Sequence, residues 1–84
     1  MSIITNTNSL IIGRQYKITP PIYDENDIHE IDLVEVLSKD KNRGHYIFKY
    51  IGIYEDDKVI NLETPFTLSK SYSDLSDYII ENID

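Results

Sequence analysis

The chain has 84 residues, no cysteine, and 15 acidic against 8 basic side chains, which gives a net charge of −7 at pH 7. This length fits a single domain, and without cysteine neither a disulfide nor a thiolate metal site can form, so apolar packing has to stabilise the fold. The negative charge repels polyanions at long range, and direct binding to nucleic acid is therefore not expected.

The N-terminal residues 1–9 contain only short apolar pairs broken by polar residues, and we expect them to be loosely ordered. They lack the basic and apolar regions of a secretory signal, and no apolar run in the chain approaches the roughly 18 residues of a membrane span. We therefore expect a cytoplasmic protein with no membrane contact. A first strand is predicted at 10–18, where LIIGRQYKI is rich in β-branched and aromatic residues and ends before Pro20 and Pro21.

Two stronger strand patterns follow a polar connection. IDLVEVLS at 31–38 is apolar on both faces, and HYIFKYIGIY at 45–54 alternates aromatic residues with isoleucine and lysine. The polar KDKNRG at 39–44 predicts a turn between them, in which Asn42 and Gly44 can adopt positive φ. Gly52 interrupts the aromatic row, which indicates a bulge or bend in this strand.

A further pair of short strands is predicted after the acidic turn EDD at 55–57. KVINLE at 58–63 forms a fourth strand, and Pro65 separates it from a short fifth strand, FTL at 66–68. The whole of this part of the chain therefore reads as a β meander.

The last segment, 71–83, has a helical period. Apolar residues recur there at intervals of three and four, at Tyr72, Leu75, Ile79 and Ile83. Ser71 or Ser73 can cap the first turn, in which Asp74 suits the helix dipole. The pattern predicts a short C-terminal helix.

Together these elements predict one mainly β domain over 1–84, with the β meander at 10–68 and the helix at 71–83. Five short strands, a long connection after the first strand and a bend within the third are compatible with a small SH3-like barrel. The alternative is an α+β fold in which an open antiparallel sheet carries the helix packed on one face. Neither architecture identifies a function by itself.

Metal and catalytic motifs are incomplete. The stretch 24–35 places oxygen-bearing side chains at five EF-hand positions, but Ile28 and His29 stand where an oxygen ligand and a glycine are needed. His29 and His45 lack a paired zinc-binding spacing. The chain also has no G-x-S-x-G elbow and no glycine-rich phosphate loop. We therefore expect neither an enzyme nor a bound metal or other cofactor.

Acidic residues are concentrated in one segment. From Tyr23 to Glu35 there are six acids and no base, whereas the other 71 residues carry nine acids and eight bases. The six are Asp24, Glu25, Asp27, Glu30, Asp32 and Glu35. Such a segment either keeps a small protein soluble or presents carboxylates to a basic partner and accelerates encounter. We take these six as the candidate partner-binding residues, with the solubility interpretation left open.

The function that these patterns favour is a small acidic protein-interaction module with a basic protein partner. An inhibitor or immunity protein that blocks a nucleic-acid-binding protein is one such module. The residue usage, rich in Ile, Asn, Asp, Lys and Tyr and without alanine or tryptophan, indicates an AT-rich coding sequence, as in low-GC bacteria and their phages and plasmids.

A second hypothesis concerns the basic hairpin at 39–49. An SH3-like adaptor could take a peptide or single-stranded nucleic acid on cationic and aromatic side chains, for which the candidates are Lys41, Arg43, Tyr46, Phe48 and Tyr50. The competing interpretation is that these rings belong to the core and that the cations cover a solvated turn.

Overall fold

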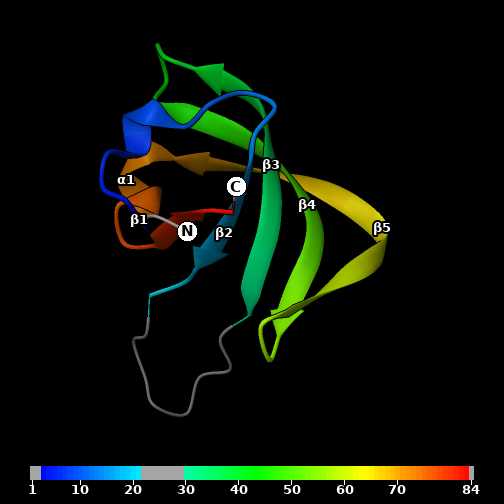
Figure 1. Ribbon diagram of the computed structural model, residues 1–84. Helices are drawn as coiled ribbons and strands as arrows, with labels where there is room; N and C mark the ends of the chain where they lie inside the picture. The colour runs from blue at the N-terminus through cyan, green and yellow to red at the C-terminus, as the bar shows by residue number, and fades with distance from the viewer. Residues whose placement is uncertain (1–2, 22–29, 84) are drawn as a thin grey trace.

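The computed structural model describes residues 3–21 and 30–83, and in this part of the chain it has one antiparallel sheet of six strands in the order β1-β6-β2-β3-β4-β5 (Figure 1). The elements are β1 (Ile3–Ile4), a 3-10 helix (Thr7–Ser9), β2 (Gln15–Thr19), β3 (Ile31–Asp40), β4 (His45–Glu55), β5 (Lys58–Ser71), α1 (Tyr72–Leu75) and β6 (Ile79–Asn82). The predicted mainly β fold with one short helix is confirmed.

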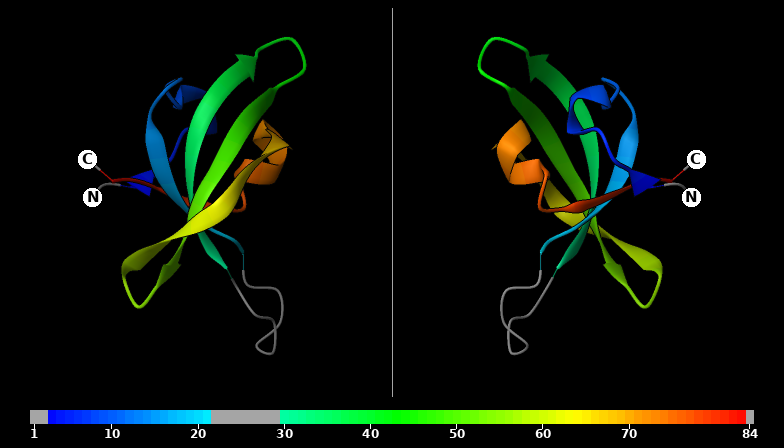
Figure 2. Two further views of the ribbon diagram at one scale, coloured as in Figure 1. Left: turned by 90° about the vertical axis from the view of Figure 1, so that its right-hand side faces the viewer. Right: turned by 90° about the vertical axis from the view of Figure 1, so that its left-hand side faces the viewer.

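The sheet is strongly curved but is not closed into a barrel. Its two edges are β1, which pairs only with β6, and β5, which pairs only with β4 in the described part of the chain. Figure 2 shows the long strands β3, β4 and β5 twisting past one another, with α1 held on the inner side of the curve. The arrangement is compatible with an open antiparallel sheet, the alternative to a barrel.

The long hairpins form where the sequence predicts them. Asp40 begins the β3–β4 turn by accepting hydrogen bonds from the amides of Asn42 and Arg43, and Gly44 closes it with φ of +67°. The β4–β5 turn has Asp56 and Asp57 at φ of 51° and 66°, the left-handed pair that a tight hairpin needs.

Gly52 lies at a break in the β4–β5 register, as its position in the sequence predicts. Tyr50 pairs with Phe66 and Gly52 pairs with Asn61, so the four residues 62–65 stand opposite Ile51 alone. A Cβ on Gly52 would lie 2.8 Å from Val59 Cγ1 and 3.0 Å from the Ile60 carbonyl oxygen. Glycine is therefore required for this close approach of the two strands.

Three element predictions need correction. Residues 10–14 are not strand, and β2 begins only at Gln15. The two strands predicted at 58–63 and 66–68 are one strand, β5, which runs through Pro65 because this proline lies in the unpaired stretch and needs no ladder hydrogen bond. The helix predicted at 71–83 is a single turn, α1, after which β6 pairs with β1 and β2.

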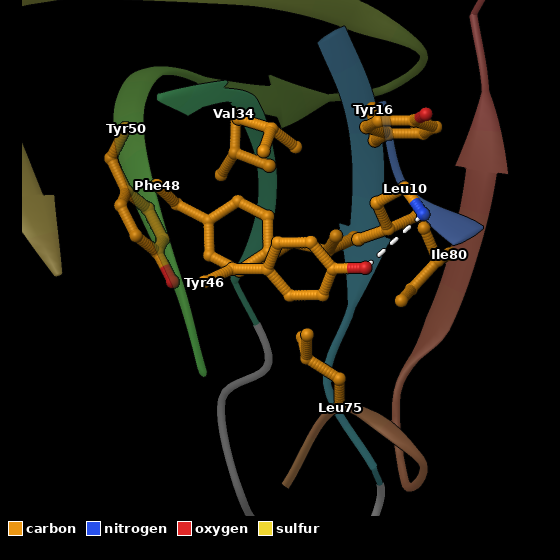
Figure 3. Packing of buried hydrophobic residues seen from close by; sticks show 10 residues of the cluster. Leu10, Tyr16, Val34, Tyr46, Phe48, Tyr50, Leu75 and Ile80 are labelled. Carbon is orange, nitrogen blue, oxygen red and sulfur yellow. Dashed lines mark hydrogen bonds between the residues drawn. The ribbon is translucent and has the colours of Figure 1, made fainter. Parts of the chain in front are cut away.

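Tyrosine hydroxyls of the core make hydrogen bonds with Thr7, which lies in the segment 1–9 predicted to be loosely ordered, and with Leu10 and Ile11, which follow it. Tyr46 Oη accepts a hydrogen bond from the Leu10 amide (3.2 Å; Figure 3). It also donates one to the Thr7 carbonyl (2.7 Å). Tyr16 Oη accepts a hydrogen bond from the Ile11 amide (3.0 Å). The sequence does not reveal these contacts because they join residues as many as 39 positions apart.

The core occupies the inner, concave face of the sheet. Its members are apolar or aromatic side chains from β2, β3, β4, β6, α1 and the segment before β2: Leu10, Tyr16, Ile18, Val34, Val36, Tyr46, Phe48, Tyr50, Leu75 and Ile80 (Figure 3). Alternation along β4 places Tyr46, Phe48 and Tyr50 inward, whereas the residues between them, which are not aromatic, face outward. The inner face is therefore lined by aromatic rings.

Candidate functional site

Two acidic segments meet at one end of the sheet. Ile31 pairs with Tyr54, which brings Glu30, just before β3, beside the β4–β5 turn with Glu55, Asp56 and Asp57. Figure 1 shows this turn and the start of β3 together at the lower end of the sheet. Glu30 and the three turn residues are exposed. We call these four residues the acidic end.

The six acids selected from the sequence do not share one surface. Asp24, Glu25 and Asp27 lie outside the described residues. Glu30 belongs to the acidic end, and Glu35 lies in the middle of β3, paired with Gln15 and Lys49 on the outer face. Asp32 lies on the inner face, because it pairs with the fully buried Ile18 and alternates with the buried Val34.

The aromatic residues proposed for the alternative function are core residues. Tyr46 and Phe48 have no exposed surface and Tyr50 has 4%. None of the three rings can stack on a base or a peptide without opening the core. Lys41 and Arg43 are exposed at the other end of the sheet, where Arg43 Nε lies 3.8 Å from Asp40 Oδ2.

A cluster of charged and aromatic side chains lies at the open side of the inner face. Lys70 on β5 donates a hydrogen bond to Tyr78 Oη (3.2 Å), and its ammonium stands 5.0 Å from the centre of the Tyr78 ring. Phe66 on β5 stacks on Tyr50, with ring centroids 5.0 Å apart and planes 5° from parallel. With Asp32, these residues form what we call the inner cluster: Asp32, Tyr50, Phe66, Lys70 and Tyr78.

The electrostatics of the inner cluster are dominated by burial. The pKa of Asp32 is raised from 3.8 to about 6, mainly by burial and also by Glu30, while Lys70 opposes the shift. Burial also raises the pKa of the Tyr50 hydroxyl, with Asp32 and Tyr78 adding to the effect. Tyr50 Oη is buried and has no hydrogen-bond partner among the described residues. The cluster therefore holds one carboxyl group, one ammonium group and an unsatisfied hydroxyl group.

Sequence reasoning missed Phe66, Lys70 and Tyr78, because only the pairing of β5 with β4 and the return of β6 bring them to Asp32. One signal was present. In IDLVEV, Asp32 has the same parity as Val34 and Val36, so strand alternation alone places a carboxyl group on the buried face. A charge at a core-facing position is rare unless it has a partner or a function.

Within residues 3–21 and 30–83, no group of three or more histidine, cysteine, aspartate or glutamate side chains is placed to hold a metal ion. No helix in these ranges is long and apolar enough to cross a membrane. Comparisons with protein-family models, with curated proteins and with solved structures found no match.

Proposed function

We propose that this chain is a small protein-binding module that engages a basic protein partner through its acidic end. The observation that supports the proposal most directly is the register of β3 and β4. This register places Glu30 beside Glu55, Asp56 and Asp57, although the two segments are more than twenty residues apart in the sequence.

The position of the acidic end suits recognition by charge. It lies on a turn and a strand terminus held by two long paired strands, so the scaffold is rigid while the carboxylates stay hydrated. Dense carboxylates of one sign repel each other and do not favour the folded state, but they accelerate encounter with a basic surface. Asp24, Glu25 and Asp27 belong to the same chain segment as Glu30 and would add to the negative potential.

Within this class we favour an inhibitor that covers the basic surface of a nucleic-acid-binding protein. The carboxylates would then take the place of phosphates. The SH3-like adaptor alternative is less well supported, because its aromatic residues, Tyr46, Phe48 and Tyr50, are used in the core.

The test begins with capture of the partner from the native host and its identification by mass. The variant Glu55→Gln/Asp56→Asn/Asp57→Asn then removes three charges, and asparagine keeps the positive φ that both turn positions require. The matched control, Glu63→Gln/Asp74→Asn/Asp77→Asn, removes three exposed acids that lie away from the acidic end. Both variants have the same net charge.

We expect the association rate constant of the acidic-end variant to fall at least about tenfold, and that of the control to fall much less. The reason is that local charge, rather than total charge, steers encounter with the partner. The affinity of the wild-type protein should also fall as salt rises. Equal association rates for wild type and the acidic-end variant would contradict the proposal and leave solubility as the role of these acids.

A further inference from the structure

The inner cluster already holds one cationic side chain in the free protein. Lys70 Nζ donates to Tyr78 Oη at 3.2 Å, lies 5.0 Å from the centre of the Tyr78 ring and interacts favourably with the Asp32 carboxylate. An aromatic face combined with a carboxylate is how proteins commonly hold an ammonium or guanidinium group. The groups around Lys70 therefore have the chemistry that holds a cation.

We propose that the inner cluster is a binding site for one lysine or arginine side chain of the partner, and that Lys70 occupies this site until the partner arrives. Asp32 and Tyr50 supply the acceptors, and Phe66 and Tyr78 supply the aromatic surfaces. This inference rests on the proposed function, since it specifies how a basic partner would be anchored.

The hydrogen bonding of Tyr50 is the observation that points to a ligand. Tyr50 is only 4% exposed, yet its hydroxyl oxygen has no hydrogen-bond partner in the described part of the chain. An unsatisfied buried hydroxyl is unfavourable, whereas a hydroxyl that accepts an N–H from a bound ligand is not.

The exposure of Phe66 gives the site an open aromatic wall. Its ring is stacked on Tyr50 on one side, and 47% of the residue is exposed. A planar guanidinium can stack on such a ring while its N–H groups reach acceptors at its edge. Phe66 lies on β5, the free edge of the sheet, so a partner can approach it without opening the core.

The charge around the cluster favours a cationic ligand over an anionic one. Asp32 is the acid of the cluster; its neighbour Glu30 adds negative charge beside it, and the positive charge of Lys70 opposes the effect of Glu30. If the Lys70 side chain swings out toward solvent, the remaining local charge is negative. Glu30 belongs to the acidic end, so the charge of the acidic end acts on the cluster.

The experiment is a titration of isotope-labelled protein with a blocked tetra-arginine peptide, followed by amide chemical shifts. Lys70→Met removes the internal occupant, and Lys17→Met is its matched control. Lys17 also stands over a tyrosine ring, at 4.9 Å from Tyr54, but it lies on the outer face of the sheet. Both changes alter the net charge equally.

The second pair of variants is Asp32→Asn and Glu35→Gln. Both remove one carboxylate from β3, the first from the inner face and the second from the outer face. The amide spectrum of each variant shows whether it is folded, and asparagine at position 32 keeps the size of the side chain while removing the buried charge.

We expect Lys70→Met to bind the peptide several-fold more tightly than Lys17→Met, because only the first change frees the site. We expect Asp32→Asn to bind about tenfold more weakly than Glu35→Gln, the effect of losing one charged hydrogen bond. The largest shifts should fall on Phe66, Lys70 and Tyr78.

Equal affinities for the two lysine variants, or for the two carboxylate variants, would overturn the inference. If the peptide shifts only residues 55–58, the cluster is not the site, whereas the proposed role of the acidic end survives. If Asp32→Asn weakens binding but the acidic-end variant does not, the site is supported and the proposed role of the acidic end fails.

Discussion

The ring of Phe66 lies parallel to the ring of Tyr50 at 5.0 Å, although Phe66 is 47% exposed and Tyr50 only 4%. The boundary of the core therefore runs between β4 and β5. The apolar row of β4 continues on β5 at Phe66 and Leu68, which pair with Tyr50 and Phe48, but each of these two residues is 47% exposed. This open aromatic edge gives the inner cluster its access to solvent.

Removal of Phe66 should cost little stability. Phe66→Ala loses one aromatic pair, and we expect the free energy of unfolding to fall by about 1 kcal/mol. Phe48, two residues before Tyr50 on β4, has no exposed surface. Phe48→Ala should therefore lower the free energy of unfolding by about 3–5 kcal/mol. Urea unfolding of both variants measures the difference, and equal losses would show that Phe66 is buried in solution.

The half-buried Asp32 should make stability depend on pH. Its folded-state pKa is raised from 3.8 to about 6, so between these values the folded chain keeps a proton that the unfolded chain has released. This group therefore lowers stability as pH rises from about 4 to about 6, and its full cost is present above pH 6.

Asp32→Asn removes that cost. The variant should be more stable than wild type at pH 7, by about 1 kcal/mol after allowance for the partial exposure of the group, and the gain should vanish below about pH 4. Thermal unfolding across this pH range is the measurement, with Glu35→Gln as the control for loss of one charge. A gain that persists unchanged at pH 3 would refute this assignment.

Alanine at position 52 should strain the β4–β5 register. The new Cβ would meet the backbone oxygen of Ile60 at 3.0 Å as well as Val59 Cγ1 at 2.8 Å, and we expect a loss of about 1–3 kcal/mol. In a Val59→Ala background one of these two contacts is absent, so the combined loss should be smaller than the sum of the single losses. Strict additivity in denaturant unfolding would argue against the clash.

Ser71 should cap α1 and Ser73 should not. Ser71 Oγ accepts a hydrogen bond from the Asp74 amide at 3.0 Å, whereas the contact of Ser73 in the same turn is made by its carbonyl group. We expect Ser71→Ala to cost about 1 kcal/mol and Ser73→Ala to have a much smaller effect. Thermal unfolding of the two variants decides between them.

The local signals in the sequence were sufficient for β3, β4 and their turns. Alternating side chains, the polar stretch at 39–44 and the acidic turn at 55–57 act over a few residues, and Gly52 marks its own bulge. Each of these features follows from backbone sterics and side-chain parity, which need no distant partner.

The sequence also shows where the acidic residues are concentrated. It showed that acids gather at 23–35, and the parity of Asp32 could have shown that one of them faces inward. It could not show that Glu30 and the turn at 55–57 are neighbours, because that proximity depends on the register in which Ile31 meets Tyr54.

The conformation of the C-terminal segment is decided only by the tertiary structure. Tyr72, Leu75 and Ile79 have a helical spacing, but the chain leaves the helix after one turn and Ile79–Asn82 inserts as β6 between β1 and β2. Strand pairing on both sides of β6 satisfies the hydrogen-bonding groups of its backbone, whereas a short isolated helix is only marginally stable in water. The pairing also buries Ile80 completely. The same return of the chain brings Tyr78 to Lys70, so the inner cluster exists only because long-range strand pairing outweighs the local helical pattern.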